Sequence, residues 1–285
     1  AFTVAPPLWQ RWWFIALMAL ALSGLLFSVF RLRTARLRRE KENLEREVAN
    51  RTNEIRQQNE ELETQRDEIK HKNDSITKSI MYARRIQNAV LPPMEELGPI
   101  LADHFIFFRP RDIVSGDFYW MTRKQGYPIF AAADSTGHGV PGAFVSMLGV
   151  AFLNEIVGSN NIQDLDAAEI LNQLRAQVIK SLRQTGRKGE AKDGMDISLC
   201  LLDTQNRQLH FAGANSPLIL IHQGKLHKFK RDRMPIGIQN ARQEPFTDHL
   251  INLHDGDQLY LFSDGFQDQF GGPKNRKFLA GNLHK

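Results

Sequence analysis

The chain has 285 residues, of which 42% are hydrophobic, and a formal net charge of +5. This length and hydrophobic content allow one ordinary globular domain with additional segments. The single cysteine, Cys200, excludes an internal disulfide framework and agrees with a reducing compartment for the main domain. Much of the positive charge follows one apolar run, so the basic balance indicates a membrane surface and no nucleic-acid partner.

The first predicted element is a transmembrane helix over residues 12–30. This stretch, WWFIALMALALSGLLFSVF, carries no charge and is long enough to cross a bilayer core. Tryptophans lie at its start, and a cluster of arginines follows its end: Arg31, Arg33, Arg36, Arg38 and Arg39. A signal peptide would carry its basic residues before the apolar run, whereas a buried soluble helix is the alternative.

The arginine cluster also predicts the orientation of this helix. By the positive-inside rule, the arginine end lies in the cytoplasm. We therefore expect a single-pass protein of a bacterial inner membrane. Residues 1–11 would then lie outside the cytoplasm, and all that follows residue 30 would lie inside it.

Residues 31–90 are predicted to form a signalling linker that is mostly a parallel coiled coil. Apolar residues recur every seven positions, at Val48, Ile55, Leu62, Ile69, Ile76 and Ala83. Asn59 and Asn73 fall at the other core position, where a buried asparagine favours a parallel dimer at some cost in stability. The segment thus predicts a homodimer, and a single solvated helix is the alternative.

A globular α+β domain is predicted to occupy residues 91–285. Leu91-Pro92-Pro93 ends the preceding helix, because proline disfavours the helical conformation of the residue before it. Short turns join many of the apolar segments that follow, which is typical of antiparallel strands. The predicted strands are HFIFF (104–108), DFYWMTR (117–123), PIFAAAD (128–134), MDISLCLLD (195–203), QLHFAG (208–213), LILIHQ (218–223), KLHKFK (225–230), TDHLINL (247–253) and QLYLFSD (258–264).

Two helices are predicted between the third and fourth of these strands. The first, about residues 141–157, is apolar nearly all round and should be buried. The second begins at Asp166, whose side chain is expected to cap the helix. The Glu169 side chain is expected to accept a hydrogen bond from the Asp166 backbone N–H in return. Two consecutive helices packed on antiparallel strands give a layered α+β domain.

Three aspartates share one kind of context, at a junction between an apolar strand and a glycine. Asp117 follows Gly116, Asp134 precedes a glycine-rich loop, and Asp264 precedes Gly265. A carboxylate at the rim of a core is costly to desolvate without a positive partner, and no lysine or arginine adjoins Asp134 or Asp264 in sequence. A hard cation, Mg²⁺ or Mn²⁺, would compensate the charge of all three carboxylates. The sequence shows no set of cysteine and histidine ligands, which argues against structural zinc. Each Asp-Gly pair by itself also fits an ordinary turn.

Six segments, in this order, resemble the signature segments of one family. They are RDIVSGDFYW, AAADSTGHGVPGAF, KDGMDISLCLLD, FAGANSPLILI, MPIGI and LYLFSDGFQDQFG. The family is the stage II sporulation protein E class of bacterial serine/threonine phosphatases, within the metal-dependent protein phosphatase 2C superfamily. The preceding IQNAVLPP resembles the linker helix that enters this domain, and VAPPLWQRWWF resembles the end of a propeller-type extracytoplasmic sensor region.

The resemblance implies a sandwich of two antiparallel sheets flanked by helices, with two Mn²⁺ or Mg²⁺ ions at one edge. It implies that Asp134 is shared by both metals and that the carbonyl of Ser135 is a further ligand. Asp117 and Asp264 complete the metal shell. With Asp134 they form the implied catalytic set. Two such ions activate water for hydrolysis of a phosphomonoester, so no protein nucleophile is assigned.

The implied function is a membrane-tethered signalling phosphatase that acts on phosphoserine or phosphothreonine of a regulatory protein, such as an anti-sigma-factor antagonist. His138 stands at a different spacing from Asp134 than the histidine of the eukaryotic Asp-Gly-His, so a role in ordering the loop is expected rather than acid catalysis. The family pattern ends with a further helix and an acidic strand that supplies another ligand. The chain stops at Lys285, so we expect either a shortened domain or an incomplete site, for which Asp268 is no substitute.

Two other functions remain open at this level. A phosphatase-like sensor or scaffold would keep the fold without the chemistry. A nucleotide cyclase also follows membrane helices and coiled coils and uses metal-binding aspartates, but only SGDFYW suits it.

Overall fold

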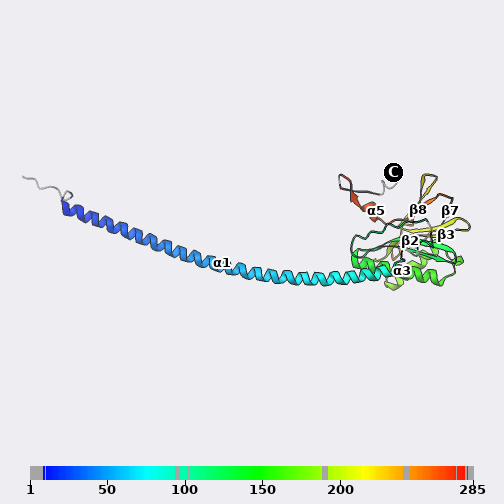
Figure 1. Ribbon diagram of the computed structural model, residues 1–285, viewed down its shortest axis with the longest axis horizontal. Coiled ribbons are helices and arrows are strands. Elements are labelled where there is room, and N and C mark those ends of the chain that lie inside the picture. Colours follow the sequence, from blue (N-terminus) through cyan, green and yellow to red (C-terminus); the bar gives the residue numbers. More distant parts are fainter. Residues whose placement is uncertain are drawn as a thin grey trace, which may run out of the picture. The chain divides into compact units, whose positions relative to one another are not determined.

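A computed structural model of the chain describes residues 9, 11–93, 97–101, 103–187, 192–239, 244–273, 275–279 and 281. The chain divides into two compact units, Ala1–Asp74 and Ser75–Lys285. Helix α1 (Trp12–Val90) provides nearly all of the described first unit, and its last turns belong to the second (Figure 1).

Helix α1 in the first unit keeps its apolar side chains exposed. The apolar window near its start meets the length and composition of a membrane span, and none of it is buried. Further along, the residues with seven-residue spacing, Val48, Ile55, Leu62 and Ile69, are 56% to 62% exposed. Ion pairs one turn apart, such as Arg56–Glu60 and Glu68–Lys72, add modest support to the helix.

The second unit is built on two main antiparallel sheets. The larger has the strand order β1-β2-β3-β4-β7 and the smaller has the order β6-β5-β8. The strands are β1 (Asp117–Lys124), β2 (Tyr127–Ser135), β3 (Met195–Asp203), β4 (Gln208–Ala214), β5 (Leu218–His222), β6 (Lys225–Phe229), β7 (His249–Asn252) and β8 (Gln258–Tyr260). A short additional pair joins β9 (Phe270–Gly271) to β10 (Arg276–Lys277).

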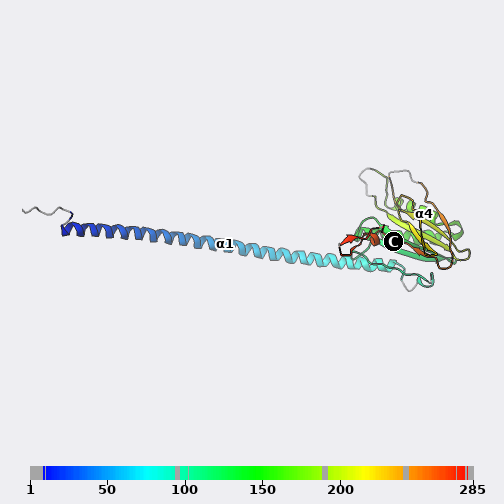
Figure 2. The same cartoon turned by 90° about the horizontal axis from the view of Figure 1, so that it is seen from above.

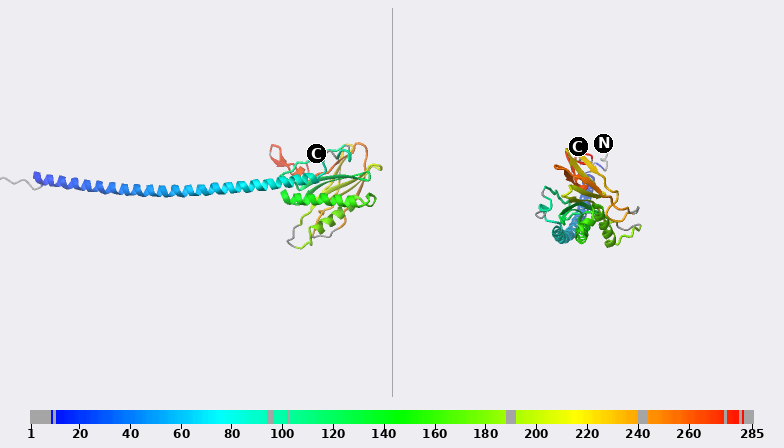
Figure 3. Two further views of the ribbon diagram at one scale, coloured as in Figure 1. Left: turned by 60° about the horizontal axis from the view of Figure 1, so that its bottom comes forward. Right: turned by 90° about the vertical axis from the view of Figure 1, so that its right-hand side faces the viewer.

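The larger sheet is covered on both faces, which explains why its central strands are apolar at nearly every position. In β3, Ile197 and Leu199 pack in the core beneath the helices, whereas Cys200 packs in the core between the two sheets. Helices α3 (Gly139–Ser159) and α4 (Ala167–Ser181) form the helical layer, seen below the sheet in Figure 1 and again in Figures 2 and 3. The short helices η2 (Ile162–Asp164) and α5 (Gly265–Asp268) complete the described helices.

The predicted α+β class is confirmed, together with the two antiparallel sheets and the helical layer. Helix α3 is apolar enough to pass the test for a membrane span, but half of its apolar window is buried in this unit, as expected for a core helix. Helix α1 ends at Val90, directly before Leu91-Pro92. Asp166 caps α4 through the backbone N–H of Glu169 (2.7 Å), but the Glu169 side chain accepts a hydrogen bond from Gln173 instead of returning the bond.

The predicted strand HFIFF is wrong. Exposed and half-buried side chains alternate along 104–108, with Phe105 and Phe107 more than 70% exposed, but no described strand pairs with this segment. Its alternation arises because Phe108 packs against Tyr119 of β1 while its neighbours face solvent. Two other predicted strands are shorter than expected, since β7 and β8 keep their pairing partners over only part of TDHLINL and QLYLFSD.

Candidate metal centre

Three carboxylates lie side by side at one end of three neighbouring strands of the larger sheet. Asp117 on β1 is directly opposite Asp134 on β2, which is directly opposite Asp196 on β3. Residues opposite one another in an antiparallel sheet point to the same face. The residues that follow Asp117 and Asp196 and the one that precedes Asp134 all pack in the helix-side core, so the three carboxylates face the second sheet.

A fourth carboxylate, that of Asp264, reaches this place from the second sheet. It follows β8 and stands at the start of the short helix α5. The hydroxyl of the preceding residue, Ser263, donates a hydrogen bond to Asp117 Oδ2 (2.6 Å), which fixes this segment against β1. The candidate centre therefore lies where the two sheets meet.

The carboxylates repel one another strongly. Burial, followed by the charges of Asp117 and Asp264, raises the pKa of Asp134 from 3.8 to about 8. Burial also raises the pKa of Asp196, an effect that a hydrogen bond from Asn215 and the charge of Arg231 oppose and that Asp264 reinforces. Like charges placed opposite one another destabilise a sheet unless a cation lies between them.

The loop after Asp134 is packed closely against the loop before Asp117. A Cβ atom at Gly116 would lie 2.8 Å from the Gly137 carbonyl oxygen and 3.2 Å from that of Ser135, so only glycine fits there. Ser135 is 3% exposed, and its Oγ has no hydrogen-bond partner among the described residues. Thr136 fixes the same loop to the residue before β3: its N–H donates to the Gly194 carbonyl, and its hydroxyl accepts from the Gly194 N–H.

These groups fit a hard divalent cation. The side chains that converge here are all carboxylates. Oxygen donors of this kind are preferred by Mg²⁺ and Mn²⁺. The candidate centre can thus hold metal ions that would offset the repulsion of its aspartates.

The structure brings the predicted residues Asp117, Asp134 and Ser135 together with Asp264 at this edge. His138 lies directly before α3, and its Nδ1 is 3.5 Å from Asp112 Oδ2. Asp268 is paired with Lys277 (2.8 Å).

Sequence reasoning missed Asp196 and two residues beside it. The side chain of Asn215 donates a hydrogen bond to Asp196 Oδ1 (3.0 Å), and the exposed guanidinium of Arg231 donates to the Asn215 carbonyl. A positive charge is thereby held next to the carboxylates. The only local signal was an acid near the start of the mostly apolar strand MDISLCLLD, and no glycine adjoins Asp196.

The end of helix α1 is hydrogen-bonded to the segment that leads into Asp117. Gln87 is 4% exposed, and its amide donates to the Ser115 carbonyl (2.6 Å) and to Ser146 Oγ on α3 (2.9 Å). Its side-chain oxygen accepts from the Ser115 N–H (3.1 Å). The final turns of the helix therefore help to position the first aspartate.

Comparison with known proteins points to one family. The sequence model of the family described as stage II sporulation protein E (SpoIIE) matches residues 124–283. The SiaA-PP2C domain of Pseudomonas aeruginosa is 32% identical with a TM-score of 0.63, and the similarity covers 74% of this chain and 81% of that one. No similar sequence was found among curated proteins.

Two further solved structures resemble the chain more distantly. The PP2C phosphatase domain and regulatory-domain fragment of SpoIIE from Bacillus subtilis is 22% identical, with a TM-score of 0.43 and coverage of 54% of this chain and 41% of that one. The S. agalactiae serine/threonine phosphatase is 18% identical, with a TM-score of 0.44 and coverage of 58% and 78%.

Proposed function

The chain belongs to the stage II sporulation protein E family of PP2C-type phosphatases, as its motifs predicted, and we propose that it is an active metal-dependent protein serine/threonine phosphatase. The observation that carries the proposal is the row of opposed carboxylates Asp117, Asp134 and Asp196, joined by Asp264 from the second sheet. Such a concentration of negative charge at one edge is understandable as a cation site.

We propose that Asp134 is shared between two Mn²⁺ or Mg²⁺ ions. Asp117, Asp264 and the Ser135 carbonyl would complete the predicted ligands, and Asp196 is added from the structure. Two divalent ions held close together lower the pKa of water and neutralise phosphoryl oxygens. The Ser263 hydroxyl would keep the Asp117 carboxylate oriented toward the metals.

The overall reaction is hydrolysis of a phosphomonoester. A bond forms between the oxygen of water and phosphorus, and the bond from phosphorus to the serine or threonine Oγ breaks. The released oxygen takes a proton, which gives the free hydroxyl side chain and inorganic phosphate. No side chain of the protein needs to become phosphorylated.

Arg231 is placed to attract the phosphate of the substrate. Its guanidinium is exposed and held by the Asn215 carbonyl, and its charge acts on Asp196. Guanidinium groups bind phosphate oxygens well, because their planar N–H donors match the phosphate geometry. We propose that Arg231 binds the phosphoryl group of the substrate.

The proposed substrate is a phosphorylated regulatory protein, such as an anti-sigma-factor antagonist, as the resemblance implies. We further propose that residues 12–30 cross a bacterial inner membrane, with 1–11 outside, a signalling linker at 31–90 and the phosphatase domain at 91–285 in the cytoplasm. The exposed apolar window of α1 and the arginines that follow it support this topology.

The test compares metal-dependent hydrolysis by the full chain and by Asp134→Asn. With Mn²⁺ or Mg²⁺, the wild-type chain should hydrolyse p-nitrophenyl phosphate and a phosphoserine peptide, and chelation should abolish both activities. Asp134→Asn removes charge from both metals at nearly constant volume, so kcat/KM should fall at least roughly 100-fold. Asp268→Asn, which changes an acid paired with Lys277, is the matched control and should retain activity.

Each alternative gives a distinct result. A folded wild-type chain without metal-dependent hydrolysis would favour the sensor or scaffold, and release of pyrophosphate from a nucleoside triphosphate would favour the cyclase. Near-wild-type activity of Asp134→Asn would contradict the two-metal assignment.

A further inference from the structure

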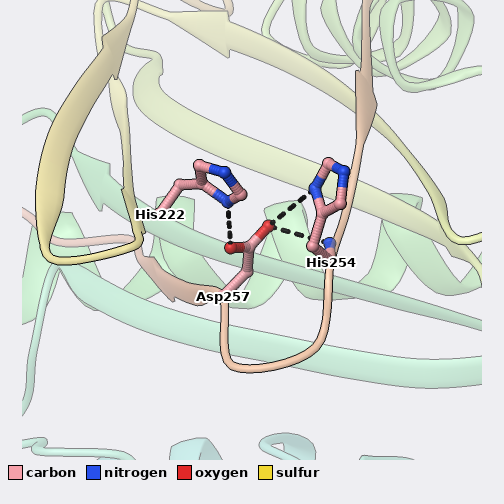
Figure 4. A group of neighbouring side chains, drawn as sticks. All are labelled: His222, His254 and Asp257. Atoms are coloured by element: carbon pink, nitrogen blue, oxygen red, sulfur yellow. Dashed lines mark hydrogen bonds and ion pairs between the residues drawn. The ribbon is translucent and has the colours of Figure 1, made fainter.

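A second cluster of metal-ligating side chains lies in the smaller sheet. His222 is the last residue of β5, whereas His254 and Asp257 belong to the turn between β7 and β8. Strands β5 and β8 pair antiparallel, with Ile221 opposite Gln258, so the end of one lies beside the start of the other. One ligand atom from each of the three residues lies within 4.8 Å of the others (Figure 4).

The Asp257 carboxylate is at the centre of this cluster and is only 5% exposed. It is 2.6 Å from His222 Nδ1, 3.8 Å from His254 Nδ1, and it accepts a hydrogen bond from the His254 N–H (2.9 Å). Burial alone would raise the pKa of Asp257, but these hydrogen bonds and the attraction of both rings hold that pKa below its usual value. The carboxylate is therefore ionised at neutral pH.

This buried charge lacks a permanent cationic partner. Within the part of the chain that the structure describes, no lysine or arginine nitrogen lies within 4.0 Å of Asp257, and both its ion pairs are to histidines. A buried carboxylate is costly unless a charge compensates it.

We propose that His222, His254 and Asp257 form a binding site for a transition-metal ion of the Zn²⁺ class. Two imidazole nitrogens and one carboxylate oxygen are the donors that Zn²⁺ takes, whereas Mg²⁺ and Mn²⁺ favour all-oxygen sites such as the aspartate centre. Sequence spacing did not indicate this site, because its ligands come from two separate segments that only the β5–β8 pairing brings together.

The two imidazole rings lie on the two oxygens of one carboxylate. His222 Nδ1 is 2.6 Å from Asp257 Oδ1, and His254 Nδ1 is 3.8 Å from Asp257 Oδ2. An ion held at about 2.0–2.1 Å from each ligand would draw the two nitrogens toward one of these oxygens. His254 is 64% exposed, so an ion can enter from solvent, and the ring of His227 on β6 lies 6.3 Å from that of His222.

Metal binding here would fasten the start of β8 to the end of β5. Strand β8 runs through 261–263 directly into Asp264 of the aspartate centre. The proposed ion would therefore stabilise the smaller sheet without taking part in the reaction. This inference does not depend on phosphatase activity.

The test is direct titration of the chelator-treated full chain with Zn²⁺ in excess Mg²⁺, which would compete with Zn²⁺ for the proposed all-oxygen centre. Isothermal titration calorimetry should show one site, and thermal unfolding should shift to higher temperature. Co²⁺ in place of Zn²⁺ should give the visible absorption of a nitrogen-ligated, low-coordinate ion.

The informative variant is His254→Ala, because its exposed ring can be removed without leaving a buried polar group unpaired. Zn²⁺ affinity should fall at least about tenfold, and the Co²⁺ absorption should be lost. His71→Ala, an exposed histidine of α1, is the matched control and should bind like wild type. His222→Gln is a second variant that keeps a polar group beside Asp257.

Two results would overturn the proposal. Unchanged Zn²⁺ binding by both His254→Ala and His222→Gln would place the ion elsewhere. Absence of Zn²⁺ binding to the folded wild-type chain would mean that protonated imidazole alone compensates Asp257.

Discussion

The carboxylate of Asp134 has too many negative neighbours to be ionised at neutral pH without a cation. Its pKa of about 8 reflects burial together with Asp117 and Asp264. A proton and a metal ion thus compete for the same carboxylate. The metal-free and metal-bound domains should consequently respond to pH in different ways.

We predict that the metal-free protein loses stability as the pH rises from about 4 to about 8. The pKa of Asp134 is raised from 3.8 to about 8 by folding, so the folded domain holds a proton that the unfolded chain releases. This contribution is complete below the unfolded pKa and is lost as the pH passes through the folded pKa. Solvent reaches part of Asp134, so the slope should be well below the roughly 1.4 kcal/mol per pH unit of a full proton.

The measurement is the unfolding temperature of the full chain in chelator across this pH range, with and without saturating Mn²⁺. The metal should flatten or reverse the decline, because it replaces the proton. Asp134→Asn removes the titrating group and should reduce the decline in chelator. A wild-type profile identical to that of Asp134→Asn would show that Asp134 does not hold the proton.

The local sequence around each aspartate predicted only part of the candidate metal centre. Asp117, Asp134 and Asp264 each join an apolar strand to a glycine, and this local pattern singled them out. Asp196 has no such glycine, and its place depends on β3 pairing with β2 in one particular register. Strand register is a long-range property, so neither Asp196 nor Arg231 could be placed from local sequence.

At the scale of elements, the strands of the central sheet were predictable because both of their faces are buried. Apolar residues dominate MDISLCLLD without a regular alternation with polar ones, and β3 spans this whole segment. HFIFF misled because a short apolar run does not show whether a partner strand exists. The termination of α1 was predictable from Leu91-Pro92, whereas the buried contacts of Gln87 were not.

We predict that Gln87→Ala lowers both stability and phosphatase activity. The substitution leaves the Ser115 N–H without its side-chain partner and removes one of the two side-chain donors to the Ser115 carbonyl, which should cost about 1–3 kcal/mol of unfolding free energy. The loop into Asp117 should also become less ordered, so kcat should fall more than stability alone explains. Urea unfolding and Mn²⁺-dependent kinetics measure the two effects.

The matched control is Gln58→Ala, an exposed glutamine of the same helix, which should change neither quantity. Loss of stability with unchanged kcat would mean that Gln87 only anchors the helix. Such a result would remove the proposed link between helix α1 and the aspartate centre.

At the scale of the whole molecule, the described residues of the first unit, unlike those of the second, form no buried apolar core. Its apolar window near the start of α1 is fully exposed, and the later stripe of apolar residues is also exposed. A membrane would cover the window, and a second copy of the chain would cover the stripe. The seven-residue spacing favours a helical partner in parallel register.

We predict that the full chain forms a parallel dimer through residues 31–90, and that Leu62→Cys forms a disulfide between two copies. Leu62 is expected at the seam, where the same residue of each helix would meet its counterpart. The native Cys200 is fully buried, so it should contribute little background cross-linking. Thr64→Cys, two residues along the same helix and facing away from the seam, is the control and should cross-link far less. Equal cross-linking at both positions, or a monomer by analytical ultracentrifugation in detergent, would contradict the parallel dimer.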